Sequence, residues 1–167
     1  MMLYLVRHAV AEESSSSGRD ADRALTADGK AKMRRAAAGL AALEVRIDRI
    51  LTSPYRRAVE TAEILASVLG GVETRVLPEL AAGADPSAVL ASLRAHRQID
   101  ALALVGHQPD LGYLASLVMT GAADACPLPF KKGAVACLEV AVPRGALRGE
   151  LSWFLTPKQL RVAGGAE

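Results

Sequence analysis

The sequence predicts an α/β protein, a three-layer α/β/α sandwich around a mainly parallel central sheet of about six strands. Short apolar runs alternate along the chain with longer segments whose apolar residues recur at helical spacing, which is typical of strand–helix–strand units. Capping residues and prolines separate these segments. We expect a single domain over residues 1–167, because a chain of this length can bury one substantial core.

The first strand is expected over Met2–Val6, an apolar run that ends directly at an Arg-His pair. The polar stretch 12–20 follows, and we interpret it as an exposed loop, either a solvated linker or a mobile rim of a site. Thr26 is a typical N-cap for a helix from Ala27 to about Leu43, which carries one apolar stripe.

The second strand is expected over Ile47–Leu51. Ser53 as N-cap and Pro54 at the first helical position then predict a helix that runs to about Leu69. The same signals predict the remaining elements: a strand over Glu73–Leu77, a helix from Asp85-Pro86 to about His96, a strand over Ala101–Val105, a helix from Asp110 to about Met119, and strands over Ala134–Val142 and Glu150–Leu155 around a turn at Pro143-Arg144-Gly145.

Composition excludes several classes of protein. A net charge of +2 is too small to indicate a nucleic-acid-binding surface. No apolar run approaches the roughly 18 residues of a membrane span, and Arg7 interrupts the first apolar run too early for a secretory signal. Cys126 and Cys137 are expected to be free thiols in a reducing compartment. We therefore expect a cytoplasmic protein that binds neither nucleic acid nor membranes.

Basic and imidazole side chains follow the carboxyl ends of the predicted strands. Arg7 and His8 follow the first strand, Glu79 the third and His107 the fourth. Parallel strands bring these ends to one edge of the sheet, where open α/β folds bind ligands. Any one histidine here could be a hydrogen-bonded core residue, but together these groups predict a pocket for a dianion such as phosphate. Arg7 and His8 would face opposite sides of a regular strand, so the backbone must bend near His8.

Helical spacing separates two candidate arginines that follow the second strand. Arg56 aligns with Glu60 on a polar face and is expected to pair with it. Arg57 aligns with Thr61 and Ile64 on a largely apolar stripe, where a guanidinium needs an anionic partner. The first helical turn also disfavours cations. We therefore assign Arg57 to the pocket. The chain has three histidines, of which His96 is expected on the surface, and no thiol cluster, so we expect no metal.

The motifs Arg7-His8-Ala9, Ser53-Pro54-Tyr55-Arg56-Arg57-Ala58-Val59-Glu60-Thr61, Leu77-Pro78-Glu79-Leu80 and Val105-Gly106-His107 resemble those of the histidine phosphatase, or phosphoglycerate mutase-like, superfamily. The segments 23–29 and Lys131-Lys132-Gly133 look most like its SixA-type phosphohistidine phosphatase branch. Ala9 stands where the superfamily usually has Gly, and SixA-like members often have Ala there. The resemblance covers roughly residues 3 to 157 and implies a phosphoglycerate mutase-like fold.

The resemblance also implies roles for individual residues. His8 would be a nucleophile that forms a phosphohistidine intermediate, with no cofactor. Glu79 matches only loosely the position at which the mutases of the superfamily have a proton donor. The remaining candidates would bind the substrate's phosphoryl group or its surroundings: Arg7, Arg57, His107, Arg23 and Lys132.

Three functions are compatible with these residues. The first is a phosphatase of phosphohistidine on a protein, such as a histidine phosphotransfer domain. The second is a phosphatase of a small phosphate ester or sugar phosphate, and the third is a non-catalytic phosphate-binding regulator. His8 argues against the third, since binding alone needs no nucleophile. An imidazole leaves more readily than an alkoxide, and the chain has little spare sequence for a lid, so both points favour the first.

Overall fold

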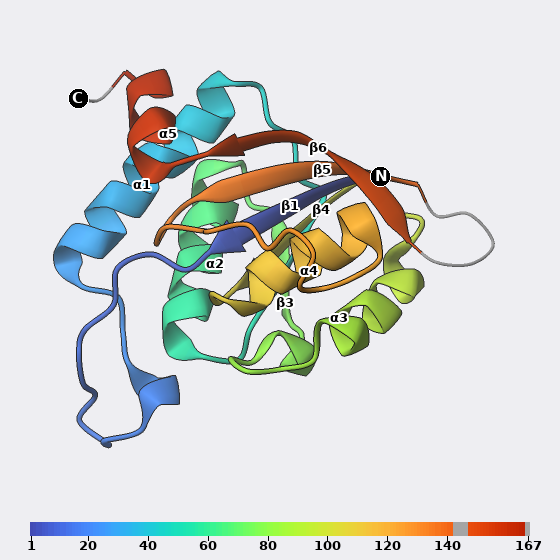
Figure 1. Ribbon diagram of the computed structural model, residues 1–167. Helices are drawn as coiled ribbons and strands as arrows, with labels where there is room; N and C mark the ends of the chain where they lie inside the picture. The colour runs from blue at the N-terminus through green and yellow to red at the C-terminus, as the bar shows by residue number, and fades with distance from the viewer. Residues whose placement is uncertain (142–146, 166–167) are drawn as a thin grey trace.

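The computed structural model describes residues 1–141 and 147–165, and its centre is a six-stranded sheet of order β3-β2-β4-β1-β5-β6 (Figure 1). Neighbours pair in parallel from β3 to β1, and β5 pairs antiparallel with both β1 and β6. The strands are β1 Met2–Arg7, β2 Arg49–Thr52, β3 Glu73–Val76, β4 Ala101–Gly106, β5 Val135–Ala141 and β6 Arg148–Leu155. The expected mainly parallel sheet is therefore confirmed.

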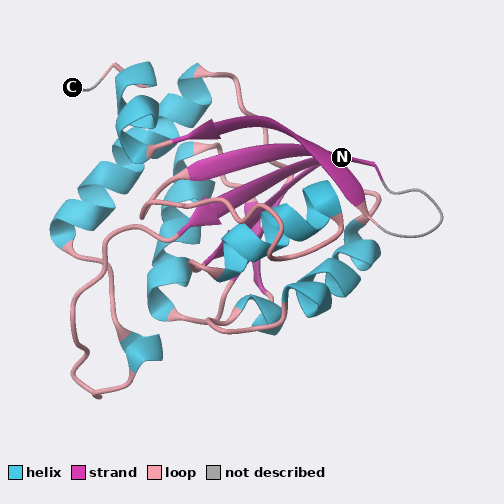
Figure 2. Ribbon diagram, in the orientation of Figure 1, coloured by secondary structure: helices cyan, strands magenta, loops and turns pink. Residues whose placement is uncertain are grey.

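Helices cover both faces of this sheet and make the three expected layers (Figure 2). Helices α1, α2 and α5 pack on one face, and α3 and α4 pack on the other. Their bounds are α1 Ala27–Ala42, α2 Arg56–Val68, α3 Pro86–Leu93, α4 Asp110–Thr120 and α5 Pro157–Ala163, with short 3-10 turns at Asp20–Asp22, Pro78–Leu80 and Arg94–His96.

The alternation of side chains along β1 fills both layers. Leu3 and Leu5 belong to the core beneath α3 and α4, whereas Tyr4 and Val6 belong to the core beneath α1 and α2. All four are buried, as expected for a central strand whose two faces are both covered by helices.

Strand register determines where the functional residues lie. Arg7 pairs with Gly106, and Thr52 pairs with Val105. The residues that follow β1, β2 and β4 therefore leave the sheet side by side at its carboxyl edge, and these include His8, Ser53 and His107.

Some element boundaries differ from the sequence-based expectations. The second main helix begins at Arg56 and not at Pro54, because the Ser53 hydroxyl accepts a hydrogen bond from the Tyr55 amide in a turn that precedes it. The third helix ends at Leu93 and continues as a 3-10 turn, and β6 begins at Arg148. Val142 and the expected turn at 143–145 lie outside the described residues.

Helix α5 is an element that the sequence-based interpretation missed. Its signals were present: Pro157 occupies the first turn, and Thr156 and Gln159 form a capping box. Cys126 and Cys137 are both free thiols, as expected. Among the described residues, every helix is too short or too polar to cross a lipid bilayer.

Candidate active site

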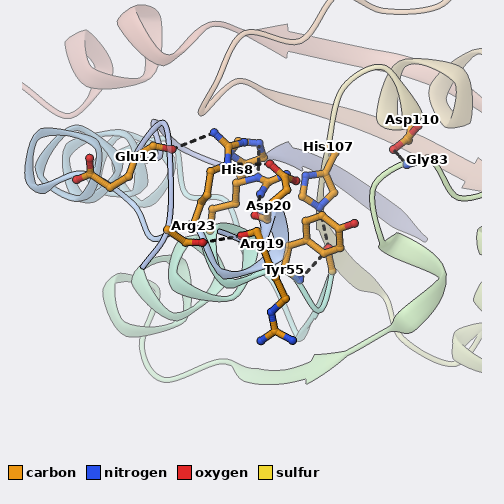
Figure 3. A network of polar contacts seen from close by, with 12 residues as sticks. His8, Glu12, Arg19, Asp20, Arg23, Tyr55, Gly83, His107 and Asp110 are labelled. Atoms are coloured by element: carbon orange, nitrogen blue, oxygen red, sulfur yellow. Dashed lines mark hydrogen bonds and ion pairs between the residues drawn. The ribbon is translucent and has the colours of Figure 1, made fainter. Parts of the chain in front are cut away.

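Three side chains meet at the carboxyl edge of the sheet and form what we call the phosphate site: His8 after β1, Arg57 on the first turn of α2, and His107 after β4. Figure 3 shows His8 and His107 in this site. All three are nearly inaccessible to solvent. The rings of His8 and His107 lie 5.2 Å apart, centroid to centroid. Arg57 Nε donates to His8 Nε2 over 3.3 Å. The structure thus brings together the two histidines and the arginine that helical spacing selected.

The tautomer of His8 follows from its hydrogen bonds. Its Nδ1 lies 2.7 Å from the carbonyl oxygen of Ala9, which can only accept, so Nδ1 carries the proton. In the neutral ring Nε2 then holds a lone pair, and this is the atom that Arg57 contacts. His8 therefore presents an unprotonated nitrogen to the phosphate site.

The surroundings keep His8 uncharged. Burial is the main cause that lowers its pKa to about 3, and the charges of His107, Arg57 and Arg7 add to the effect, while the hydrogen bond to Ala9 opposes it. A nitrogen that stays free of protons across the physiological pH range is what a nucleophile requires.

Arg7 is close enough to the site for its charge to act on both histidines, and the backbone turns between Arg7 and His8. The amide of Gly133 lies within hydrogen-bonding distance of the Arg7 and His8 carbonyls, at 3.1 and 3.2 Å. Successive carbonyls of a regular strand point in opposite directions, so the backbone turns here. The guanidinium of Arg7 donates from Nη1 to the Phe130 carbonyl, and its buried Nε has no partner within the described residues. Its charge helps lower the pKa values of both histidines.

Arg57 has an anionic partner within the protein, Asp20, from the end of the polar segment 12–20. Arg57 Nη2 lies 2.9 Å from Asp20 Oδ2, and Nη1 donates to the Asp20 carbonyl over 2.7 Å. The other carboxylate oxygen lies 2.8 Å from Arg23 Nε. Hydrogen bonding to Arg57 is the main cause that lowers the pKa of Asp20. Of the two interpretations of segment 12–20, the rim of a site is therefore the better description.

One ring nitrogen of His107 is hydrogen-bonded and the other is not, among the described residues. Its Nε2 lies 2.7 Å from Ser53 Oγ, which also accepts from the Tyr55 amide. Its Nδ1 is buried without a partner among the described residues. Burial is the main cause that lowers its pKa to about 4, with the charge of Arg57 next. The ring of Tyr55 packs edge-on against it, with centroids 5.0 Å apart.

Glu79 lies near His107, and no hydrogen bond or ion pair joins it to His8 within the described part of the chain. One of its oxygens accepts from Ser92 Oγ over 3.1 Å, and the other is buried without a partner. Glu79, Asp110 and His107 line a cavity of about 10 Å³, which is enough for about one water molecule. The catalytic role expected for Glu79 stays a prediction.

The other expected residues divide between two places. Arg23 joins the rim through Asp20, whereas Lys132 lines a separate cavity that has Ala9 in its wall. Arg56 pairs with Glu60 over 2.9 Å, as expected for a surface residue. Within residues 1–141 and 147–165, no three His, Cys, Asp or Glu side chains are grouped so that they could hold a metal ion.

Comparisons with known proteins agree with this geometry. A model of the histidine phosphatase superfamily (branch 1) matches residues 3–82. Over 166 residues the chain is 30% identical to phosphohistidine phosphatase SixA of Escherichia coli, with 98% of each protein covered. An uncharacterised protein of Picosynechococcus sp. is 42% identical over 123 residues, which are 72% of this chain and 74% of that protein.

The solved structures extend the comparison to the fold. A structure of the protein histidine phosphatase SixA complexed with tungstate superposes with a TM-score of 0.84 at 29% identity, and covers 96% of this chain and 99% of that chain. The phosphoglycerate mutase-like fold expected from the sequence is thereby confirmed.

Proposed function

The chain belongs to the histidine phosphatase superfamily, within its SixA-type branch, and is a phosphatase; from this premise we propose that its substrate is phosphohistidine on a protein. The observation that carries the proposal is the neutral His8, whose Nε2 lone pair faces the guanidinium of Arg57. A nucleophile beside a phosphate-binding cation supports transfer through a covalent intermediate. A histidine phosphotransfer domain is a partner of the required kind.

In the first step, the lone pair of His8 Nε2 attacks phosphorus and forms a P–N bond. The bond between phosphorus and the substrate nitrogen breaks, and its electron pair stays on the leaving imidazole, which takes up a proton. In the second step, a water oxygen attacks phosphorus and the P–Nε2 bond breaks, with loss of a proton from the water. Inorganic phosphate leaves and neutral His8 is restored.

The arginines supply electrostatic stabilisation for both steps. Arg57 and Arg7 bring positive charge close to His8. At an effective dielectric constant near 20, one pair of unit charges about 4 Å apart is worth about 4 kcal/mol. Desolvation offsets part of this value, but two guanidiniums still favour the charge that builds up on the transferring phosphoryl group.

The leaving group supports phosphohistidine over a phosphate ester. An alkoxide needs a proton donor as it departs, and the candidate carboxyl group, Glu79, is hydrogen-bonded to Ser92 and not to a residue of the phosphate site within the described residues. An imidazole can instead take its proton from solvent near neutral pH.

A substrate panel tests the proposal. A protein phosphorylated on histidine, free phosphohistidine and a set of sugar phosphates are each incubated with the purified protein, and phosphate release is measured. We expect kcat/KM to be highest for the phosphohistidine protein. A clear preference for sugar phosphates would overturn this assignment and support a phosphatase of small esters.

A further inference from the structure

A second cavity, of about 220 Å³, lies beside the phosphate site. One wall is Ala9, the residue that directly follows His8, and the others come from α1, from the turn at 132–133 and from α5. We call it the basic cavity, and it is lined by Ala9, Val10, Gly29, Lys32, Met33, Ala36, Lys132, Gly133, Pro157 and Arg161.

The basic cavity has cations from three separate elements: Lys32 on α1, Lys132 before β5, and Arg161 on α5. No acidic residue is among those that line it. Lys32 is paired with Asp28 on its own helix over 2.6 Å, but that carboxylate lies outside the lining. Like charges gathered around one hollow repel each other and attract an anion.

A hydrogen bond to the backbone of α5 fixes the position of the Arg161 guanidinium. Its Nη1 donates to the Pro157 carbonyl one helical turn earlier, which holds the guanidinium against α5. Guanidinium and ammonium groups together suit a carboxylate, which accepts hydrogen bonds at both oxygens. The apolar part of the lining, Met33, Ala36 and Pro157, suits methylene groups that precede the carboxylate.

The size of the cavity distinguishes between sources of this carboxylate. Small-molecule sites usually have volumes of about 300–1,000 Å³, so the basic cavity is too small for most whole metabolites and suits one side chain. Its wall at Ala9 is one residue from His8, and consecutive Cα atoms are about 3.8 Å apart. The cavity thus adjoins the residue that follows the nucleophile, which makes a side chain near the phosphohistidine the first candidate to enter it.

We propose that the basic cavity binds a glutamate side chain of the phosphorylated protein, close to its phosphohistidine, and so selects substrates with an acidic neighbour. This inference rests on the proposed function. It assigns Lys32, Lys132 and Arg161 to recognition of the protein substrate, outside the phosphoryl chemistry.

The test uses two histidine-phosphorylated peptides that differ only in having Glu or Gln at the positions flanking the phosphohistidine, and free phosphohistidine as a third substrate. For the wild-type protein we expect kcat/KM to be roughly five- to tenfold higher for the Glu peptide, as for a partly buried charge pair. Arg161→Gln and Lys32→Gln should each reduce this preference and leave hydrolysis of free phosphohistidine unchanged. Arg161→Lys should retain most of it.

Arg34→Gln is the matched control, because Arg34 is exposed on α1 and does not line the cavity. A wild-type protein that hydrolyses both peptides equally, or a preference that survives in Arg161→Gln and Lys32→Gln, would overturn the inference. A preference for small phosphorylated acids over neutral sugar phosphates as large as the preference for the Glu peptide over the Gln peptide would also count against a protein ligand. Failure of the wild-type protein to hydrolyse any phosphohistidine compound would instead overturn the proposed function.

Discussion

Arg57 contacts His8 and Asp20 at the same time: its Nε lies 3.3 Å from His8 Nε2, and its Nη2 lies 2.9 Å from Asp20 Oδ2. The carboxylate of Asp20 also meets Arg23. The carboxylate of Asp20 thus pairs with two cations, Arg57 and Arg23, that could otherwise bind a phosphoryl group. A phosphoryl group that enters the site must displace Asp20 or share the guanidinium with it.

Replacement of Asp20 should therefore strengthen the binding of anions. In Asp20→Asn we expect the inhibition constant of vanadate to fall roughly threefold, since the carboxylate is more than half exposed and its pairing with Arg57 is worth at most about 1 kcal/mol. Asp22→Asn is the control, because Asp22 pairs with Arg19 in the same segment. Weaker vanadate inhibition in Asp20→Asn would show that Asp20 orients Arg57 and does not compete with the ligand.

Two neighbouring arginines should differ sharply in their effect on turnover. Arg57→Ala removes a buried cation that contacts the nucleophile, and we expect kcat/KM to fall by roughly 10²–10³. Arg56→Ala removes an exposed cation paired with Glu60, and its effect should stay within about threefold. Steady-state kinetics on one phosphohistidine substrate compares them. Equal losses in the two variants would contradict the assignment of Arg57.

The stability of the protein should depend on pH through its two buried histidines. The pKa of His8 is lowered to about 3 and that of His107 to about 4, from an ordinary value near 6.5. At pH values between the lowered and the ordinary pKa, each histidine binds a proton in the unfolded chain and stays neutral in the folded chain. The free energy of unfolding should thus fall as the pH is lowered from about 6.5 to 4.5, with a slope approaching about 1.4 kcal/mol per pH unit for each histidine.

Urea unfolding at a series of pH values measures this slope. His8→Asn and His107→Asn should each flatten it, because each removes one group that takes up a proton on unfolding. Carboxylates whose pKa values are lowered, such as Asp20 and Glu60, lose their contribution only at lower pH. A slope in His8→Asn equal to that of the wild-type protein would contradict a neutral His8.

The contact between α1 and α5 requires a glycine at position 39. A Cβ at Gly39 would lie 1.8 Å from the Leu160 carbonyl oxygen, a backbone atom that cannot move aside alone. Gly39→Ala should lower the free energy of unfolding by about 1–3 kcal/mol despite the better helix propensity of alanine. Ala38→Ser at the exposed neighbouring position should change it by less than about 0.5 kcal/mol. Thermal or urea unfolding measures both, and an unchanged Gly39→Ala would contradict this packing.

Sequence patterns predicted those site residues that lie on a helix or directly after a strand. His8 and His107 follow apolar strands, and helical spacing distinguishes Arg57 from Arg56. Each of these predictions depends on local periodicity and on the rule that parallel strands end together. The structure brings these side chains together as expected.

Contacts that depend on tertiary structure could not be predicted in this way. Asp20 begins a short 3-10 turn in a polar segment without periodicity, so only the need of Arg57 for an anion pointed to such a partner. Ser53 was interpreted as a helix cap, and its hydroxyl instead links the Tyr55 amide to the imidazole of His107. The start of α5, by contrast, could have been predicted, because the capping box that begins at Thr156 is visible in the sequence.

The central claim is that His8 Nε2 carries the phosphoryl group during turnover. Rapid quenching of the protein with a ³²P-labelled phosphohistidine substrate, followed by denaturing electrophoresis at alkaline pH, tests it most directly. We expect an acid-labile label on the wild-type protein and on Arg56→Ala, and none on His8→Ala. Turnover by the wild-type protein without a trapped label, or a label that persists in His8→Ala, would contradict the claim.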